Sequence, residues 1–293
     1  MRCIGPPRVT VSARGDALAP AADPRPGTLV EGAVAVLAAA EPAAKVALSR
    51  EVAGAWRGGD LAIGQTDPPP RPARPSRPSL LPPRDMPKRR NFGSPTGRIA
   101  LLHAVAHIEL NAIDLAWDLV ARFGEAGLPR AFFDDWVTVA AEEAEHFELL
   151  AARLATLGSA YGDLPAHDGL WEAAVATAHH PLARLAVVPL VLEARGLDVT
   201  PEMICRLERA GDDESAAVLD RIYHDEISHV AAGRRWFEWL CERQGSEPCE
   251  TFHVLVRGHF TGMLKPPFNR QARENAGFPA AYYEKLACAD ARC

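Results

Sequence analysis

The sequence contains a Glu-x-x-His motif twice, and this repeat constrains the fold more than any other feature. The first copy is Glu143-Ala-Glu-His146 and the second is Glu226-Ile-Ser-His229. On an α-helix, side chains three residues apart lie on one face about one turn apart, so each Glu and its His reach the same point beside the helix. Each copy therefore predicts a helix that presents two ligand-type side chains together.

A single Glu precedes each motif at nearly the same distance along the chain. Glu109 lies 34 residues before Glu143, and Glu193 lies 33 residues before Glu226. Each glutamate interrupts a stripe of apolar residues at helical spacing, so each is expected on the buried face of its helix. Two helix pairs that each supply one Glu and one Glu-x-x-His suit a bundle that holds two metal ions in its core. The sequence therefore predicts an all-α fold, a four-helix bundle with one long crossover.

The predicted bundle occupies residues 96–245. Apolar spacing and turn residues predict helices that follow Ser94-Pro95-Thr96 to about Arg122 and then span about 130–157, 181–197 and 212–243, with a short helix at 170–178 in the crossover. Pro189 lies one turn before Glu193 and is expected to free the carbonyl of Leu185 and kink the third helix. Thr200-Pro201 is expected to begin a separate short helix that runs to about Gly211.

Three segments flank the predicted bundle. Residues 1–27 are rich in Pro, Ala, Gly and Arg, which favours a disordered lead. Residues 28–95 are expected to form one or two short helices, broken at Glu41-Pro42, and then an extended Pro-rich strap. Residues 246–293 are expected to form a C-terminal helical extension, with a helix at about 249–258.

The Pro-rich strap is also basic. Its cationic residues are Arg71, Arg74, Arg77, Arg84, Lys88, Arg89 and Arg90. One interpretation is a basic arm that binds a phosphate-bearing substrate. The other, which we favour, is a strap that lies on an acidic bundle.

Composition and charge narrow the class of protein. The net charge of −6 and the pI of about 5.9 give no general attraction to nucleic acid or anionic membranes. We find no apolar run of the ~18–20 residues that a membrane span needs and no apolar core of a signal peptide. The cysteines are scattered, which favours reduced thiols over a disulfide framework. We therefore expect a soluble, cytoplasmic protein that does not bind membranes.

The chemistry of the repeated motif points to metal. A buried carboxylate has to be protonated, paired or metal-bound, because burying an unpaired charge is too costly. Four carboxylates and two imidazoles offer mostly hard oxygen ligands, which suit iron or manganese, and they balance the charge of two divalent ions. The alternative is that all six are ordinary polar residues on helix surfaces. That alternative has to explain why each lies on its helix's apolar stripe at two nearly equal spacings.

Several runs resemble a known family. They are His103-Ala-Val-Ala-His-Ile-Glu109, Glu193-Ala-Arg-Gly-Leu-Asp198, Tyr223-His-Asp-Glu-Ile-Ser-His229 and Leu264-Lys-Pro-Pro-Phe-Asn269. Over roughly residues 28–285 the chain resembles the DUF455 branch of the ferritin-like di-iron carboxylate superfamily. The resemblance implies a ferritin-like bundle whose metal ligands are Glu109, Glu143, His146, Glu193, Glu226 and His229.

The resemblance also implies roles beyond the ligands. The acids that directly precede the two Glu-x-x-His motifs, Glu142 and Asp225, would each hydrogen-bond a ligand His on the opposite helix. Pro189 and the long C-terminal segment depart from a minimal ferritin subunit, which argues against cage assembly and bulk iron storage. A tRNA-modifying oxygenase in the wider superfamily keeps tRNA open as a substrate of the basic strap.

These observations lead to one functional hypothesis and two alternatives. The hypothesis is an O2-dependent di-iron oxidoreductase that hydroxylates, desaturates or otherwise oxidises a bound small molecule. Nothing resembles a built-in flavin or ferredoxin domain, so a separate electron donor is expected. The first alternative is ferroxidase-type iron binding or peroxide scavenging, with self-association and a small apolar interior. The second is a metal-free helical interaction module.

Two further sets of residues carry weaker expectations. His103 and His107 are expected to face away from Glu109, as supporting or surface residues. Lys265, Arg270 and Arg273 are candidates for an anion pocket in the C-terminal segment.

Overall fold

The computed structural model describes residues 26–86, 93–124 and 127–287. Within these ranges the regular structure is helical, and β-pairing is limited to isolated bridges. The all-α prediction is therefore confirmed for the described part of the chain. The expected disordered lead lies outside the described residues, except for its last two positions.

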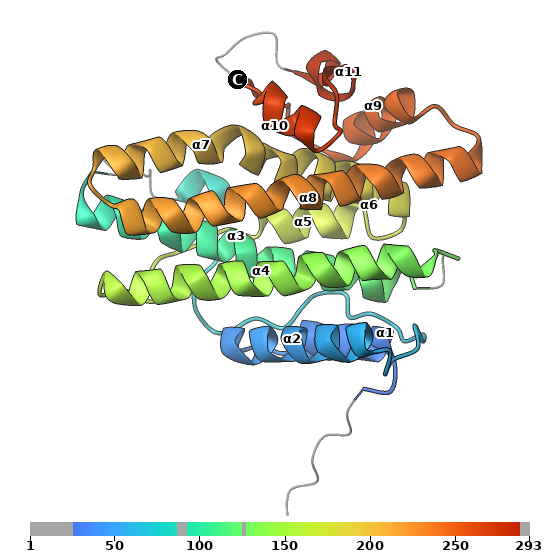
Figure 1. The fold of residues 1–293 in the computed structure, drawn as a ribbon, viewed down its shortest axis with the longest axis horizontal. Helices are drawn as coiled ribbons and strands as arrows, with labels where there is room; N and C mark the ends of the chain where they lie inside the picture. The colour runs from blue at the N-terminus through green and yellow to red at the C-terminus, as the bar shows by residue number, and fades with distance from the viewer. Residues whose placement is uncertain (1–25, 87–92, 125–126, 288–293) are drawn as a thin grey trace, which may run out of the picture.

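Long helical runs form the centre of the molecule (Figure 1). They are α3 (Pro95–Arg122), α4 (Arg130–Thr156), the continuous run of α6 (Pro181–Val187), η2 (Val188–Glu193) and α7 (Ala194–Arg209), and α8 (Asp213–Gln244). α3 packs on α4, α4 packs on α8, and α8 packs on the α6–α7 run. The connection from α4 to α6 contains α5 (Gly169–Ala176) and passes back along the length of these helices, as the crossover prediction requires.

The third run corrects one prediction. Instead of ending near Leu197 and restarting at Thr200-Pro201, the helix continues through Pro201 to Arg209. Pro201 has no N–H for the carbonyl of Leu197, and the side-chain amide of Asn269 donates to that carbonyl instead, at 3.2 Å. A partner 72 residues away therefore replaces the missing bond, which a local pattern does not show.

The irregularity expected at Pro189 takes the form of a π-helical segment. η2 begins at Val188, next to this proline, and its last residue is Glu193. α8 approaches η2 very closely, because a Cβ added to Gly233 would lie 2.5 Å from Cβ of Pro189. Single π-helical turns within α-helices are frequent at functional sites. Here the turn sets the position of a predicted ligand.

The N-terminal helices cover one side of the long helices. α1 (Leu29–Ala38) packs on α3, and α2 (Pro42–Gly58) packs on α4. Thr28 and Glu31 form a capping box at the start of α1. The break between the two helices falls at Glu41-Pro42, as predicted.

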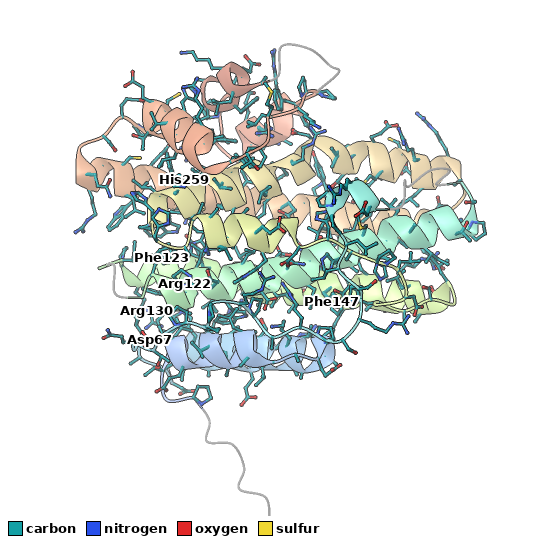
Figure 2. The ribbon with its side chains drawn as sticks, turned by 180° about the vertical axis from the view of Figure 1, so that it is seen from behind. Asp67, Arg122, Phe123, Arg130, Phe147 and His259 are labelled. Carbon is teal, nitrogen blue, oxygen red and sulfur yellow. The ribbon has the colours of Figure 1, made fainter. Side chains whose placement is uncertain are left out.

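The Pro-rich segment runs back over the bundle without forming a long helix. Apart from the short turn η1 (Pro83–Asp85), its described residues are not helical. Arg71 pairs with Asp168, Arg74 with Asp114 and Arg77 with Asp163. The carbonyl of Pro69 accepts from Arg122, the last residue of α3, which is labelled in Figure 2. These contacts support the strap interpretation, whereas Lys88, Arg89 and Arg90 lie outside the described residues.

The C-terminal segment packs on the opposite side of the molecule. It contains α9 (Pro248–His259), α10 (Arg270–Asn275), α11 (Ala280–Tyr283) and the short η3 (Glu284–Leu286). α9 packs against α6 and α8, and α10 against α7 and α8. Phe252, Phe278, Tyr282 and Tyr283 form the aromatic core of this extension. The segment therefore packs against the helical run that contains Glu193 and against α8, which carries Glu226 and His229.

Among the described residues, one helix is long and apolar enough to span a membrane, whereas the sequence predicted no membrane span. This helix is α3, and 72% of its most apolar window is buried inside the protein. A buried window of this kind is typical of the core helix of a soluble protein. Its apolar character is explained by the neighbours that cover it.

Candidate metal centre

The long helices bring the predicted ligands to one place in the core. α3 supplies Glu109, α4 supplies Glu143 and His146, η2 supplies Glu193, and α8 supplies Glu226 and His229. One ligand atom from each of Glu109, Glu143, His146 and Glu226 lies within 4.8 Å of the others. The structure therefore brings residues that are far apart in sequence into a single buried cluster.

Glu143 lies between the two histidines. Nδ1 of His146 is 3.4 Å from carboxylate oxygens of both Glu143 and Glu109. Nδ1 of His229 is 3.0 Å from Glu143 and 3.6 Å from Glu226. The two imidazole rings are 5.8 Å apart between centroids. Glu143 thus joins two halves, each with its own His and its own outer Glu.

The outer nitrogens of the two histidines contact acids on the opposite helix. Nε2 of His146 on α4 is 3.1 Å from Asp225 on α8, and Nε2 of His229 on α8 is 2.8 Å from Glu142 on α4. These are the two contacts that the resemblance implied for Glu142 and Asp225. Each carboxylate fixes its imidazole ring so that Nδ1 faces the cluster, which is how supporting acids orient metal-binding histidines.

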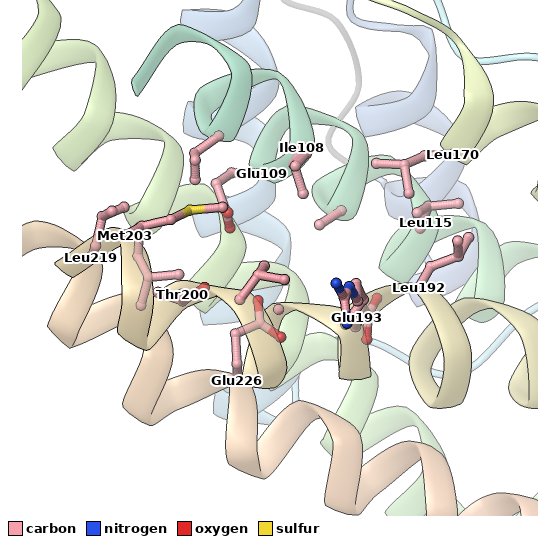
Figure 3. A pocket seen from close by; sticks show the side chains of 16 residues that line it. Ile108, Glu109, Leu115, Leu170, Leu192, Glu193, Thr200, Met203, Leu219 and Glu226 are labelled. Atoms are coloured by element: carbon pink, nitrogen blue, oxygen red, sulfur yellow. The ribbon is translucent and has the colours of Figure 1, made fainter. Parts of the chain in front are cut away.

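Glu193 stands at the edge of the cluster. Its carboxylate is not one of the four ligand groups whose atoms lie within 4.8 Å of one another. Glu193 lines a cavity together with Glu109 and Glu226 (Figure 3). Burial raises the pKa of Glu193 well above its usual value, and the negative charges of Glu226 and Glu143 raise it further. The carboxyl is therefore close enough to the cluster for the charges of Glu226 and Glu143 to raise its pKa.

The cluster has too many negative charges for a buried site. Burial and the charge of Glu143 raise the pKa values of Glu109 and Glu226. Burial acts to raise the pKa of Glu143 too, but the adjacent imidazoles of His146 and His229 outweigh burial and lower that pKa. Burial opposes a charged His146, yet Glu109 and Glu143 raise its pKa to about 11. Without a metal ion, protons on these groups have to supply the missing positive charge.

Several buried atoms of this cluster make no well-aligned hydrogen bond with the described residues, although most of them lie 3.0–3.6 Å from an atom of another member. They are Oε2 of Glu109, Oε1 of Glu143, Oε2 of Glu193, Oε2 of Glu226 and Nδ1 of His229. Buried polar atoms are nearly always satisfied, so a concentration of unsatisfied ones at one point needs a ligand to explain it. Carboxylate oxygens and imidazole nitrogens are donors that suit iron or manganese. The residues present therefore fit a metal centre.

An apolar cavity of about 150 Å³ opens onto this centre. Its walls come from α3, α5, η2, α7 and α8, and the carboxylates of Glu109, Glu193 and Glu226 form its polar side (Figure 3). Sequence patterns placed the three acids on buried faces but did not predict a cavity beside them. The gap between α3 and α7 is a property of the packing and leaves no local signal in the sequence.

His103 and His107 are buried structural residues, so of the two expected placements the structure excludes the surface. His103 Nε2 accepts the backbone N–H of Gly162 at 2.9 Å. His107 Nδ1 lies 2.8 Å from the Tyr161 hydroxyl, and its Nε2 lies 3.0 Å from the His167 carbonyl. Both histidines hold the crossover against α3.

The three cations proposed for an anion pocket have other neighbours. Arg273 is buried and donates to both carboxylate oxygens of Asp198. Arg270 pairs with Glu284, and Lys265 is exposed at a position whose carbonyl accepts from Arg195. This geometry gives no support to a shared anion pocket, because the two arginines are neutralised by acids of the chain.

Comparisons with known proteins place the chain in a family. The model of the family described as "Protein of unknown function (DUF455)" matches residues 38–284. An uncharacterized protein of Haemophilus influenzae is 44% identical over 211 residues, a match that covers 70% of this chain and 73% of the relative. No solved structure matches the chain. The family model spans most of the chain, including all six predicted ligands, and the chain therefore belongs to the DUF455 family.

Proposed function

We propose that the chain is a ferritin-like di-metal protein that uses iron, or manganese in its place, for the O2-dependent oxidation of a small molecule. The observation that carries the proposal is the set of unsatisfied atoms of Glu109, Glu143, Glu193, Glu226 and His229 in one buried cluster. The order of these ligands along the helices, Glu then Glu-x-x-His in each half, is the pattern of di-iron carboxylate bundles.

The protein's own residues would divide the work at such a centre. Glu143 would bridge the two halves, with Glu109 and His146 on one side and Glu193, Glu226 and His229 on the other. Asp225 and Glu142 would hold the histidines in orientation. The bound metal would supply the activation of O2 and the redox chemistry, while the helices exclude water and hold the substrate.

Two observations favour an oxidase or hydroxylase over the alternatives. The cavity beside Glu109, Glu193 and Glu226 gives an organic substrate a place at the centre, which a ferroxidase-type function does not need. A metal-free interaction module gives no account of the unsatisfied carboxylates.

The strap's Arg71, Arg74 and Arg77 are already paired with acids of the chain, so a small molecule is favoured over tRNA as the substrate. We further propose a cytoplasmic protein, served by a separate electron donor and capable of self-association.

The decisive experiment measures bound metal. The full chain is purified without chelator, beside the double variant Glu143→Ala/Glu226→Ala. We expect about two equivalents of iron or manganese in the wild type and loss of both in the variant. Glu148→Ala/Glu214→Ala is the matched control, because it removes exposed carboxylates from the same two helices. Absence of bound metal in the wild type, even after anaerobic addition of Fe(II), would overturn the proposal.

A further inference from the structure

The cavity beside the cluster has one charged side, and the rest of its wall is mostly apolar. Glu109, Glu193 and Glu226 form the charged side. The remaining wall is dominated by hydrocarbon side chains from several helices, including Leu115, Leu170, Leu192, Val199, Leu219 and Ile222. Ile108 also lines the cavity and is 47% exposed, so the cavity reaches the surface next to this residue. An apolar site that meets a metal centre on one side is suited to hold hydrocarbon against it.

The size of the cavity limits the ligand. Its volume is about 150 Å³. A buried apolar cavity of ~150 Å³ accommodates benzene. A single aromatic ring or an alkyl group of similar bulk therefore fills the space, and a nucleotide or a folded macromolecule does not enter it.

The charges around the cavity limit the ligand further. Arg195 is the cationic side chain in the described wall, and its guanidinium donates to the carbonyls of Lys265 and Pro267, at 2.6 and 3.3 Å. It also lies 3.4 Å from the carboxylate of Asp198. Arg195 is thus already engaged by the chain, and an anion that entered this mostly apolar cavity would lose its hydration without a free cation of the described wall to replace it. Thr200 adds a neutral hydroxyl to the wall.

We propose that this cavity is a substrate site for a small, uncharged, largely hydrocarbon molecule about the size of one aromatic ring. The inference rests on the proposed function, because the molecule would lie against the carboxylates that hold the metal. Binding itself depends on the shape and polarity of the cavity, so it is measurable without turnover.

Gly196 provides a way to fill the cavity without touching the ligands. It lines the cavity on α7, and a Cβ built on it would meet no heavy atom within 4 Å. A larger side chain at this position is therefore free to occupy the site. The substitution also removes a glycine from a helix interior, which favours the helix.

The experiment titrates the full chain, both metal-loaded and metal-free, with toluene and, separately, with benzoate, using calorimetry and ligand-observed NMR. We expect toluene to bind the wild type with and without metal, and benzoate to bind the metal-free wild type at least roughly tenfold more weakly, because the cavity offers its charge no free cation among the described residues. We expect Gly196→Leu to weaken toluene binding at least roughly tenfold by filling the cavity. Gly196→Met tests the same block with a more flexible side chain. Gly196→Ala, which leaves most of the space free, is the control.

Metal content, measured on each sample, separates the two proposals. Failure of toluene to bind a wild type that holds two equivalents of metal would overturn this inference and leave the proposed function standing. Equal toluene binding by wild type, Gly196→Leu and Gly196→Met would overturn it as well. Toluene binding that is lost in these variants, in a protein that takes up no metal, would support the cavity and overturn the proposed function.

Discussion

At the scale of single residues, the candidate centre is defined by the orientation of its histidines. The motif spacing predicted that Glu143 and His146 share a face, and likewise Glu226 and His229. The spacing did not show which imidazole nitrogen faces the cluster. That choice is made by Asp225 and Glu142, each of which contacts Nε2 of the histidine on the other helix. The contact is tertiary, so only the resemblance to a family anticipated it.

Removing one of these acids tests its positioning role. We expect Asp225→Asn to weaken metal binding by roughly 10–100-fold, because the amide holds the imidazole ring of His146 less well. The unfolding midpoint of the metal-free protein should change little, since Asp225 is partly exposed. Competition against a chelator of known affinity measures the effect. Asp220→Asn, an exposed acid on the same helix, is the control, and equal losses in both variants would contradict the positioning role.

His103 shows a second residue-scale effect, the burial of a neutral histidine. Its Nε2 accepts the N–H of Gly162, and its ring stacks on Tyr161 with centroids 5.3 Å apart. Burial lowers the pKa of His103, and the charge of Asp163 offsets part of this. Protonation would turn the accepting nitrogen into a donor that faces another donor. The folded state therefore prefers the neutral form.

The sign of the pH dependence follows from that preference. A histidine whose pKa is lowered by folding contributes stability that is complete above its unfolded pKa of ~6.5 and is lost as the pH falls below it. We expect the free energy of unfolding in urea to fall more between pH 7 and pH 5 in the wild type than in His103→Gln. The glutamine keeps an acceptor for Gly162 and does not titrate. Other groups, such as the buried His107, titrate in both proteins and cancel in the comparison. Equal slopes in the two proteins would show that His103 is not responsible.

At the scale of elements, the sequence predicted the long helices and the irregularity at Pro189, but it wrongly predicted a break at Thr200-Pro201. The bounds of α3, α4 and α8 follow from apolar periodicity and from turn residues, which are local signals. The continuation of α7 through Pro201 depends instead on Asn269, which donates to the carbonyl of Leu197 and to the hydroxyl of Tyr223. The side-chain oxygen of Asn269 also caps α10 by accepting from Ala272. The side chain of Asn269 thus supplies hydrogen bonds to two helices, α7 and α10.

A single-atom change separates the two tasks of Asn269. Asn269→Asp keeps the oxygen that caps α10 but removes the donor to Leu197 and places a charge near it. We expect the free energy of unfolding to fall by ~1–3 kcal/mol, because a buried carbonyl loses its partner. Hydrogen exchange should show faster opening of α7 around Pro201 than in the wild type. Gln271→Glu, at an exposed amide of the same segment, is the control. Unchanged exchange in α7 would mean that the proline is tolerated for another reason.

At the scale of the whole molecule, buried charges join the N-terminal helices and the strap to the bundle. Lys45 on α2 and Asp114 on α3 are both buried and lie 2.6 Å apart. Arg74 of the strap pairs with the same Asp114 and donates to Asn111. Lys45 also donates to the carbonyl of Val36 at the end of α1. The sequence predicted each segment but not this junction, because its charged residues are far apart along the chain and carry no motif.

The contacts of Lys45 with Asp114 and Val36 predict which helices unfold first when this junction is weakened. We expect Lys45→Met to lower the free energy of unfolding by ~3–5 kcal/mol, because Asp114 stays buried with one of its two cations removed. Arg50→Met, on the same helix, removes a cation from an exposed pair with Glu148 and should cost at most ~1 kcal/mol. Urea unfolding measures both. Because Lys45 joins α1 and α2 to Asp114 on α3, hydrogen-exchange protection should fall first in α1 and α2, with metal content unchanged. Equal loss of protection in α8 would contradict this, since it would mean that the N-terminal helices and the helices of the candidate metal centre unfold as one unit.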